Sequence, residues 1–489
     1  MRKKQKKQKK QSQNGNPNTP SKKYSEQPLR VLRGIWILGI ALIAVWLIKI
    51  MIADSASLRA NGYNPRVQQT EERFIRGALR DSAGRVLAET VIEEDNVRRV
   101  YPYGEACAHV TGYTGMGKTG LELAANEWLL QPAGFEEKWQ QWFGGDKIRG
   151  CDVVTTPDAE LQTYIYGLLD GYRGAAVVSD PSTGKVLALV SSPSFQPETV
   201  EADWDRISQD EASPLYARAT QGLYPPGSTF KIVTALALYR TAADPFAYRY
   251  TCTGQIELGG SQLRCSHGLI HGDQCIREAF ANSCNCFFAG LGVKLGGARL
   301  QQTADSLHIG RTFSFDLPQS TSSVRMDASP TEAMIAETAM GQGETLMTPL
   351  QLNMISSAIA NQGIVYEPYL MDRVIDKNGH TVKKFLPQWY GALMTPEEAA
   401  YLEELMEGVV TIGTAPSLAD ARWQVYGKTG TAQVGEGIED HSWFTGYARL
   451  GDRTVALTVL IENGGEHKKA VPVARKILEY LSEAGAMPE

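Results

Sequence analysis

Outside its first 33 residues, this chain lacks enough Lys and Arg to balance its Asp and Glu. Residues 1–33 hold eleven Lys or Arg against the single acid Glu26, whereas all 489 residues together have a formal net charge of −5. The remainder is therefore strongly acidic, which argues against nucleic acid as a partner of the folded part. The basic segment consists largely of Lys, Gln, Asn, Pro and Ser, which cannot form a core, so we predict a disordered arm over 1–33.

The chain also lacks cysteines at the paired Cys-x2-Cys spacing of common zinc sites. Five of the seven cysteines and two histidines nevertheless gather in one stretch: Cys252, Cys265, His267, His271, Cys275, Cys284 and Cys286. Zinc ligands would have to come from several separate loops, so we predict no metal and no cofactor. Gly259-Gly260 lies midway between Cys252 and Cys265, which suits a hairpin whose ends meet. A disulfide between these two cysteines is therefore the alternative to free thiols.

The chain also lacks a convincing nucleotide-binding loop. Residues 112–119 match Gly-x4-Gly-Lys-Thr, but this pattern is specific only when a hydrophobic strand leads into it. The preceding residues 103–110 are too short and mixed for such a strand, and an ATP site outside the cell would lack ATP. We interpret 112–119 as a glycine turn before a helix over 121–130.

One long apolar run is present, from Gly34 to Ala53, with Lys49 as its only charge. Twenty helical residues span about 30 Å, the thickness of the hydrocarbon layer. A cleaved signal peptide is the alternative, but residues 54–57 are a poor small-x-small cleavage site. We predict a transmembrane anchor over 34–53, with the basic arm in the cytoplasm and the rest of the chain outside a bacterial cell membrane.

Beyond the anchor, the patterns predict an α+β fold. Residues 76–88 indicate two short strands around a Ser-Ala-Gly turn, within a small, mainly β pedestal domain over 54–150. The larger domain over 151–489 has predicted helices at 158–171, 348–361 and 470–481 and predicted strands at 174–180, 185–192, 443–448 and 454–461. With a strand around 428–431, these strands make one five-stranded antiparallel sheet flanked by helices. Residues 246–330 look irregular and partly helical.

The most informative stretch is residues 224–238, in which Tyr-Pro-Pro-Gly ends what precedes and Ser228 opens an apolar helix. Lys231 is three residues further on and therefore rises from the same helical face. Burial among Ile, Val, Ala and Leu, near the positive end of the helix dipole, favours its neutral amine. A neutral amine beside a hydroxyl is a nucleophile–base pair. The alternative is a serine N-cap followed by a lysine that reaches out to solvent.

Two further stretches complete a known set of motifs. Ser283-Cys284-Asn285 follows an amphipathic segment, and Lys428-Thr429-Gly430-Thr431 lies in an edge strand where the glycine lets a substrate backbone approach. Ser-x-x-Lys, Ser-x-Asn and Lys-Thr-Gly form the motif set of β-lactamases and penicillin-binding proteins. Together with Arg76-Gly77, Tyr224-Pro225-Pro226-Gly227, Gly341-Gln342-Gly343 and His441-Ser442-Trp443-Phe444, they make the chain resemble a class B penicillin-binding protein, a monofunctional peptidoglycan D,D-transpeptidase.

The resemblance implies four catalytic residues, Ser228, Lys231, Ser283 and Lys428, and four substrate-binding residues, Asn285, Thr429, Gly430 and Thr431. Ser228 would attack the carbonyl between the terminal D-alanines of a stem peptide and pass its proton to Lys231. Ser283 would relay a proton to the leaving D-alanine, with Lys428 lending positive charge. The backbone N–H groups of Ser228 and Thr431 would form an oxyanion hole.

Substrate binding and partners follow from the same resemblance. Asn285 would bind the substrate amide and orient Lys231, while the Thr429 and Thr431 hydroxyls would hold its terminal carboxylate. The implied partners are peptidoglycan stem peptides, β-lactam antibiotics and a polytopic membrane glycosyltransferase. A β-lactamase, a β-lactam sensor and an inactive wall-synthesis scaffold are the alternatives, whereas residues 54–150 are too few for the glycosyltransferase domain of a bifunctional class A enzyme. The chain departs from the family pattern at Ala217, where asparagine is usual.

Overall fold

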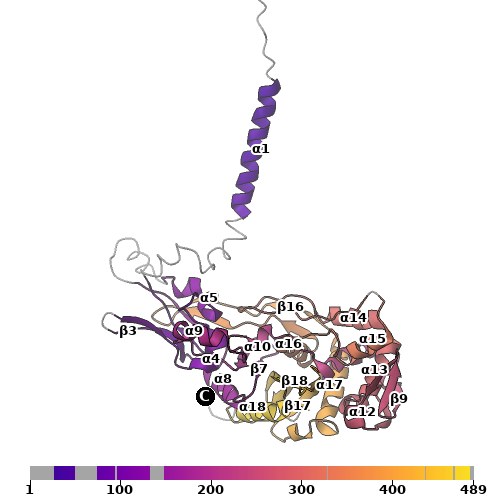
Figure 1. The fold of residues 1–489 in the computed structure, drawn as a ribbon. Coiled ribbons are helices and arrows are strands. Elements are labelled where there is room, and N and C mark those ends of the chain that lie inside the picture. The colour runs from indigo at the N-terminus through magenta and orange to yellow at the C-terminus, as the bar shows by residue number, and fades with distance from the viewer. Residues whose placement is uncertain are drawn as a thin grey trace, which may run out of the picture. The chain divides into compact units, whose positions relative to one another are not determined.

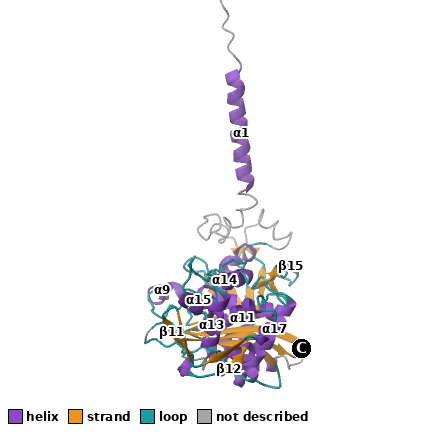
Figure 2. Ribbon diagram, turned by 90° about the vertical axis from the view of Figure 1, so that its right-hand side faces the viewer, coloured by secondary structure: helices purple, strands orange, loops and turns teal. Residues whose placement is uncertain are grey.

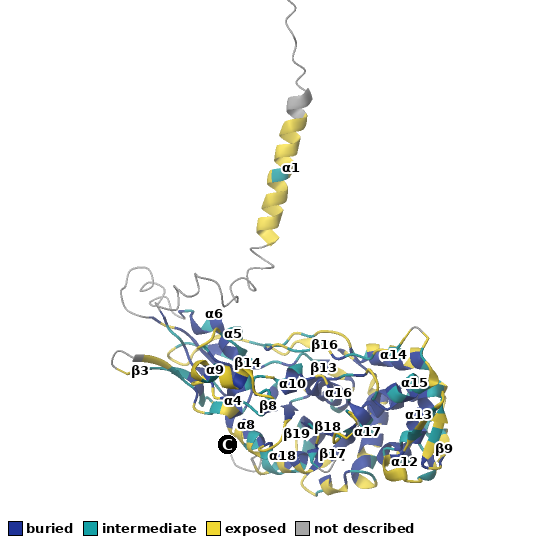
Figure 3. Cartoon of the chain, in the orientation of Figure 1, coloured by how far each residue is buried: buried dark blue, intermediate teal, exposed yellow. Residues whose placement is uncertain are grey.

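The computed structural model describes residues 27–49, 74–93, 96–132, 148–327, 329–435, 437–465 and 469–484. The chain divides into two compact units, Met1–Arg59 and Ala60–Glu489. In the first unit, α1 (Gln27–Lys49) begins within the predicted basic arm, and its residues Val31–Lys49 are long and apolar enough to cross a membrane. Its large apolar residues between Val31 and Ile48 are exposed, and Figure 3 colours this part of the helix accordingly. Residues 1–26 of the predicted arm and 50–53 of the predicted anchor lie outside the described residues.

A five-stranded antiparallel sheet is the framework of the second unit (Figure 1). Its strand order is β17 (Gln424–Ala432), β18 (His441–Leu450), β19 (Arg453–Ile461), β7 (Gly174–Ser179) and β8 (Val186–Ser192). All neighbouring strands pair in the antiparallel sense. The predicted sheet is therefore confirmed, with β17 and its residues 428–431 at one edge.

Three helices pack against this sheet, namely α8 (Ala159–Leu168), α16 (Pro349–Ala360) and α18 (Ala470–Ala484). Figure 2 distinguishes the helices of this unit from its strands by colour. The hydroxyls of Ser356 in α16 and Thr445 in β18 lie 2.8 Å apart, so Thr445 faces α16. Ser442 faces the other side, because its position differs from that of Thr445 by an odd number of residues. Its hydroxyl accepts a hydrogen bond from the backbone N–H of Ala470, and α18 therefore covers that second face together with α8.

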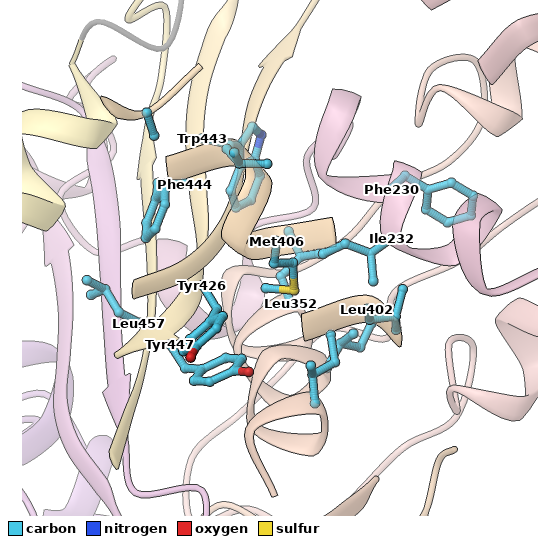
Figure 4. Close-up of a cluster of buried hydrophobic side chains, with 14 of the residues drawn as sticks. Phe230, Ile232, Leu352, Leu402, Met406, Tyr426, Trp443, Phe444, Tyr447 and Leu457 are labelled. Atoms are coloured by element: carbon cyan, nitrogen blue, oxygen red, sulfur yellow. The ribbon is translucent and has the colours of Figure 1, made fainter. Parts of the chain in front are cut away.

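A group of helices packs beside the β17 edge of the sheet: α11 (Lys231–Tyr239), α12 (Ile276–Ala281), α13 (Asn285–Leu295), α14 (Gly297–Ser306), α15 (Glu332–Ala339) and α17 (Pro396–Thr411). Figure 4 shows the apolar core between these helices and the sheet, with Ile232 of α11, Met406 of α17 and Trp443 of β18 all buried. The apolar run after Ser228 is thus buried in the core, as its composition predicted.

The stretch predicted as irregular, 246–330, also contains four short strands. They form two antiparallel pairs, β9 (Arg249–Cys252) with β12 (Gly272–Cys275) and β10 (Gln255–Leu258) with β11 (Ser261–Arg264). Gly259 and Gly260 connect β10 to β11 with φ angles of 55° and 81°, a left-handed conformation that glycine adopts without strain. The hairpin predicted between Cys252 and Cys265 is therefore confirmed.

A six-stranded mixed sheet joins the regions before and after residue 150. Its order is β15 (Thr381–Lys384), β14 (Met371–Ile375), β6 (Asp152–Thr155), β2 (Leu79–Arg80), β3 (Val86–Glu93) and β4 (Asn96–Val100). β2 and β3 are the antiparallel pair predicted over 76–88, whereas β2 runs parallel to β6. The sheet thus crosses residue 150, and the division into domains 54–150 and 151–489 stays a prediction.

The glycine-rich stretch 112–119 is a tight turn between two helices, α4 (Gly104–Thr111) and α5 (Gly120–Ala124). Gly112 has a φ of 71°, and a Cβ atom there would lie 2.0 Å from the carbonyl oxygen of Thr119. A helix rather than a strand leads into the turn, so the nucleotide-binding interpretation is excluded and the glycine turn is confirmed. The helix predicted over 121–130 is divided into α5 and α6 (Asn126–Leu129).

Short elements complete the second unit: β1 (Phe74–Ile75), β5 (Ile148–Arg149), α9 (Val200–Ser208), α10 (Arg218–Gln221), β13 (Ile364–Tyr366), β16 (Trp389–Ala392), and the 3₁₀ turns η2 (Gly227–Phe230), η3 (Pro245–Ala247), η4 (Ser266–Gly268) and η5 (Pro416–Leu418). Of these, η2 carries Ser228 and packs against β17.

Candidate active site

Ser228 lies in the 3₁₀ turn η2, and the α-helix that the sequence placed at this serine begins three residues later, at Lys231. Residues three apart eclipse each other in a 3₁₀ turn, so Ser228 and Lys231 still share a face. Neither η2 nor α11 has a side-chain cap hydrogen bond. The alternative in which Ser228 is only a helix N-cap is therefore wrong.

Gly227 allows η2 to lie directly against β17. Its φ is 53°, and its backbone N–H donates to the carbonyl oxygen of Gly341 at 2.9 Å. A Cβ atom at this position would lie 2.4 Å from the carbonyl oxygen of Thr431. Since only glycine tolerates both the left-handed backbone and this close approach, Gly227 sets the separation between Ser228 and the Lys428–Thr431 segment.

Lys231 is completely buried, and its ammonium joins the first motif to the second. Its Nζ donates to the Ser283 carbonyl oxygen at 2.8 Å and to the Asn285 Oδ1 at 2.7 Å, and lies 3.3 Å from the Ser283 Oγ. The alternative in which Lys231 reaches out to solvent is wrong. Burial lowers its pKa to about 8, although the nearby thiols of the Cys284 region act in the opposite direction.

The Ser-x-Asn motif spans the end of the short connection between α12 and α13 and the first residue of α13, Asn285. Ser283 has a φ of 56°, a conformation that is costly for a residue with a side chain and is often found at functional sites. The Cys284 sulfur accepts a hydrogen bond from the backbone N–H of Phe287 and so caps α13. Asn285 Oδ1 accepts from Lys231, and its Nδ2 donates to the Arg264 carbonyl oxygen at 3.0 Å. The motif is thus tied both to α11 and to the end of β11.

The third motif lies in β17, where the side chains of successive residues point to opposite faces of the sheet. Lys428 pairs with Thr445 across the strands, so its side chain points toward the helices, where it is completely buried 5.5 Å from the Phe280 ring. Its Nζ donates to the Thr429 carbonyl oxygen at 3.2 Å. Thr429 points the other way, and its hydroxyl lies 2.6 Å from that of Thr414. A Cβ atom on Gly430 would lie 2.9 Å from the Thr229 Cγ2, so glycine is required there for η2 to pack on the strand.

Burial and the neighbouring Lys231 hold the pKa of Lys428 well below its usual value of 10.5. Two ammonium groups in one buried site repel each other, so an anion beside them favours the state in which both lysines are charged. A bound carboxylate would restore the charge of Lys428, because an opposite charge at short distance favours the ionised form. This site therefore suits a negatively charged ligand.

The three motifs meet at a cavity of about 600 Å³. Five of the predicted site residues line this cavity: Ser228, Ser283, Asn285, Thr429 and Thr431. Lys231 and Lys428 are buried beside it. Sequence reasoning missed several lining residues: Arg264, His271, Gln342, Thr414, Gln433 and Asp440. Gln342 belongs to the Gly-Gln-Gly run that contributed to the family resemblance, whereas the other five residues are not part of any of the family motifs.

Cysteines from separate loops meet beside this cavity, contrary to the sequence argument against a metal site. Donor atoms of Cys252, Cys265, His271 and Cys284 all lie within 4.8 Å of one another. All seven cysteines are free thiols, and the Cys252 and Cys265 sulfurs are 3.6 Å apart without a bond. The structure therefore has two free thiols where a disulfide was the alternative.

Comparison with known protein families gives two matches. Residues 174–479 match the penicillin binding protein transpeptidase domain, and residues 76–153 match the penicillin binding protein A dimerisation domain. The peptidoglycan D,D-transpeptidase PbpA of Mycolicibacterium smegmatis is 32% identical over 474 residues, which cover 90% of this chain and 94% of that protein. The peptidoglycan D,D-transpeptidase MrdA of Escherichia coli is 28% identical over 453 residues, covering 78% of this chain and 71% of that protein.

Solved structures resemble this fold over most of its length. Penicillin-binding protein A of Mycobacterium tuberculosis, as its imipenem acyl-enzyme complex, has a TM-score of 0.78 and 31% identity, with 84% of this chain and 99% of that chain covered. The penicillin G acyl-enzyme complex of the same protein has a TM-score of 0.76, also at 31% identity, with 83% and 99% covered. The fold that holds the three motifs here is thus one in which acyl-enzymes with β-lactams have been observed.

The contact of Gly227 with β17 predicts a specific loss of stability. We expect Gly227→Ala to lower the free energy of unfolding of the full-length chain by about 1–3 kcal/mol more than Gly451→Ala does, because it adds a steric clash to the backbone strain. Gly451 is a matched control, since its φ is 60° but a Cβ atom there meets nothing within 4 Å. Urea denaturation followed by tryptophan fluorescence measures both, and equal losses would contradict the close approach.

Proposed function

The chain belongs to the penicillin-binding protein transpeptidase family and is a peptidoglycan D,D-transpeptidase, and we propose that Ser228, Lys231, Ser283 and Lys428 are its catalytic residues. The observation that carries this assignment is the convergence of the three motifs at one cavity. The enzyme cross-links stem peptides through an acyl-enzyme with release of D-alanine, and β-lactams acylate it.

In the proposed acylation step, the Ser228 oxygen attacks the carbonyl carbon between the two terminal D-alanines. The new carbon–oxygen bond replaces the carbon–nitrogen bond, and D-alanine leaves with a proton on its amine. Lys231 takes the proton of Ser228 as the general base, and Ser283 passes a proton to the leaving amine. The 3.3 Å distance between Lys231 Nζ and Ser283 Oγ supports this relay.

The developing negative charge on the attacked carbonyl oxygen needs fixed donors. We assign this role to the backbone N–H groups of Ser228 and Thr431, which would polarise the carbonyl from η2 and from β17. The packing of Gly227 against the Thr431 backbone supports the assignment, because it brings the two segments close enough to share one oxygen. No side chain has to be ordered during the reaction, so this stabilisation is preorganised.

The substrate's terminal carboxylate is assigned to the Thr429 and Thr431 hydroxyls, with Lys428 behind them. An anion there would offset the burial and the repulsion from Lys231 that lower the pKa of Lys428. Asn285 orients Lys231 through its Oδ1, and its Nδ2 has a second hydrogen for the substrate amide besides the one donated to Arg264. Gly430 leaves room for the peptide backbone along the strand edge. An amine of a neighbouring stem peptide then opens the acyl-enzyme and completes the cross-link.

We also propose that α1 anchors the chain once in a bacterial cell membrane, with the N-terminal arm in the cytoplasm and the catalytic unit outside. The apolar stretch Val31–Lys49 and the basic residues before it support this orientation. A polytopic peptidoglycan glycosyltransferase is the proposed partner, because a monofunctional transpeptidase needs another protein to polymerise the glycan strands. Co-purification from solubilised membranes tests this partnership.

The membrane orientation predicts which end a protease can reach. Protease added to intact spheroplasts is expected to degrade the catalytic unit but to leave an epitope placed before residue 27 intact. Permeabilised spheroplasts are the control, in which both ends should be degraded. Immunoblots against the two ends read out the result, and loss of the N-terminal epitope from intact spheroplasts would reverse the proposed topology.

The assignment of the nucleophile predicts where penicillin binds covalently. Mass spectrometry of the full-length chain in detergent is expected to show one penicillin adduct in the wild type and none in Ser228→Ala. Ser283→Ala should be acylated about 10²-fold more slowly or worse, because it removes the proton relay. Ser266→Ala, in the lining of the same cavity, serves as the matched control and should react at the wild-type rate.

Two of the alternative functions, a β-lactamase and an inactive scaffold, give a different result in the same experiment. A β-lactamase would release hydrolysed penicillin within seconds to minutes and leave no stable adduct, and an inactive scaffold would form none. An adduct that persists in Ser228→Ala would remove the catalytic assignment. Incubation with a donor stem peptide and an amine acceptor then measures the cross-linked product directly.

The lowered pKa of Lys231 predicts how acylation depends on pH. Only the neutral amine can accept the proton of Ser228, so the neutral fraction and the rate should rise about tenfold per pH unit below the pKa of about 8 and level off above it. The second-order rate constant for acylation by penicillin, measured at pH values below and above 8, tests this rise and plateau. The midpoint of thermal unfolding at each pH is the control for stability, and a rate that falls as pH rises through 8 would exclude Lys231 as the base.

A further inference from the structure

A second cavity, of about 350 Å³, shares no lining residue with the cavity at which the three motifs meet. It lies between α4, the glycine turn over 112–119, the end of β8, α9 and α10. Its volume falls within the range of small-molecule sites in proteins, about 300–1,000 Å³. We propose that this cavity binds one uncharged aromatic small molecule that carries a hydroxyl group.

Aromatic and aliphatic side chains provide the apolar lining of this cavity. The Phe195 ring meets the rings of His109 and Tyr113 edge-on, with centroids 5.4 Å and 5.8 Å apart. Trp204 of α9 and Leu215 pack against the same small apolar cluster, which is distinct from the main core. Aromatic rings prefer offset or edge-to-face contacts with one another, and the apolar area that they bury stabilises a bound molecule. This lining therefore favours a ligand with a flat, aromatic body.

The described residues that line the cavity include no acidic side chain, lysine or arginine. Burial, together with the charge of Arg218, lowers the pKa of His109 to about 4. The carbonyls of Pro193 and Pro214 act in the opposite direction, but the imidazole is neutral at pH 7. Arg218 itself is paired with Glu462 at 2.8 Å. An ionised ligand would be buried here without a counter-ion, which is costly, so the ligand is uncharged.

Two buried polar atoms in this lining lack a hydrogen-bond partner among the described residues. They are the Nε2 of His109 and the hydroxyl oxygen of Thr220, a residue that is only 1% exposed. By contrast, the Ser191 hydroxyl accepts a hydrogen bond from the backbone N–H of Ala219 at 3.0 Å. An unpaired polar atom in a buried site is costly. A ligand hydroxyl both donates and accepts, so it pairs with the threonine and with Nε2 in either tautomer of the neutral ring.

Ala217 leaves space in this cavity. It lines the cavity at the N-cap of α10 and makes no side-chain cap hydrogen bond. This is also the position at which the chain departs from the asparagine that is usual in its family. An asparagine would add an amide group to the lining, whereas alanine leaves that volume open to a ligand. Replacement of Ala217 by a larger residue therefore tests the site directly.

The cavity also joins two parts of the chain that match different family domains. Its lining residues from α4 and the glycine turn lie within 76–153, and the others lie within 174–479. A molecule bound there contacts both parts at once, and it binds the folded chain only. Binding of this kind raises the stability of the folded chain as the ligand concentration exceeds the Kd. The ligand would therefore strengthen the junction between the two parts.

Three small probes test the ligand class on the full-length chain in detergent. p-Cresol, toluene and p-toluate share a ring and a methyl group, and they differ in having a hydroxyl, no polar group or a carboxylate. Equilibrium dialysis, with the same detergent on both sides, is expected to find about one saturable p-cresol site per chain. Toluene should bind this site about tenfold more weakly, and p-toluate should not bind it. Only binding that is lost in Ala217→Phe counts as binding to this cavity.

The outcomes with these probes decide the proposal. The lack of a saturable p-cresol site in the wild type overturns it. Toluene bound to this cavity as tightly as p-cresol overturns the role of the hydroxyl, and p-toluate bound more tightly overturns the uncharged class.

Variants place the p-cresol site in the chain. Ala217→Phe fills the cavity and should abolish binding, while Thr220→Val removes the unpaired hydroxyl at nearly constant shape and should weaken binding about tenfold. Thr345→Val is the matched control and should bind normally, because its hydroxyl is also buried and unpaired but lies outside this cavity. Ala217→Asn is a second filling variant that retains a good helix N-cap, in case phenylalanine disrupts folding. Wild-type affinity in both Ala217→Asn and Thr220→Val overturns the site.

The midpoint of thermal unfolding gives an independent readout. p-Cresol at about ten times its Kd should raise the midpoint of the wild type and of Thr345→Val, but not that of Ala217→Phe. An equal shift in all three proteins overturns the proposal. Ser228→Ala should bind p-cresol as the wild type does, so a failure of the catalytic assignment leaves this result unaffected.

Discussion

The buried ammonium of Lys231 is the contact on which this site depends. The Lys231 side chain extends from α11 within the apolar core. Its Nζ donates hydrogen bonds to Ser283 and Asn285, where α12 connects to α13. A lysine in such a place is stable only when its donors are satisfied, because burial without partners is costly. The same bonds that stabilise the buried amine therefore hold the second motif against the first, and the lowered pKa of Lys231 follows from the same burial.

Two unusual backbone positions let the three motifs meet. Gly227 has a left-handed conformation that brings η2 against β17, and Ser283 has a similar φ although it carries a side chain. Such strain persists only where packing and hydrogen bonds on several sides enforce it. Here the antiparallel sheet supports β17, the apolar core supports α11, and the cysteine cluster adjoins the Ser-x-Asn connection. A rigid surrounding is what an enzyme needs to hold a nucleophile, a base and an oxyanion hole in register.

Much of the fold and most of the site could be predicted from local patterns. Apolar strands around residues 174–192 and 443–461 predicted the sheet, because a strand signal depends only on neighbouring residues. The motifs of Ser228, Ser283 and Lys428 predicted a candidate site by their order, and those residues or their neighbours line one cavity. The six-stranded sheet was not predicted, since β14 and β15 join β6 from more than two hundred residues away in sequence, and pairing at such separation leaves no local signal.

What the amino-acid sequence determined by itself was therefore chemistry and local conformation: a serine one turn before a buried lysine, a glycine in an edge strand, an apolar run long enough for a membrane. Only the tertiary structure decided distances between segments. It replaced the first helical turn at Ser228 by a 3₁₀ turn, because close packing against β17 overrides helix propensity. It also gathered Cys252, Cys265 and Cys284 from three separate segments of the chain. Convergence of this kind depends on how the elements pack, which spacing along the chain does not encode.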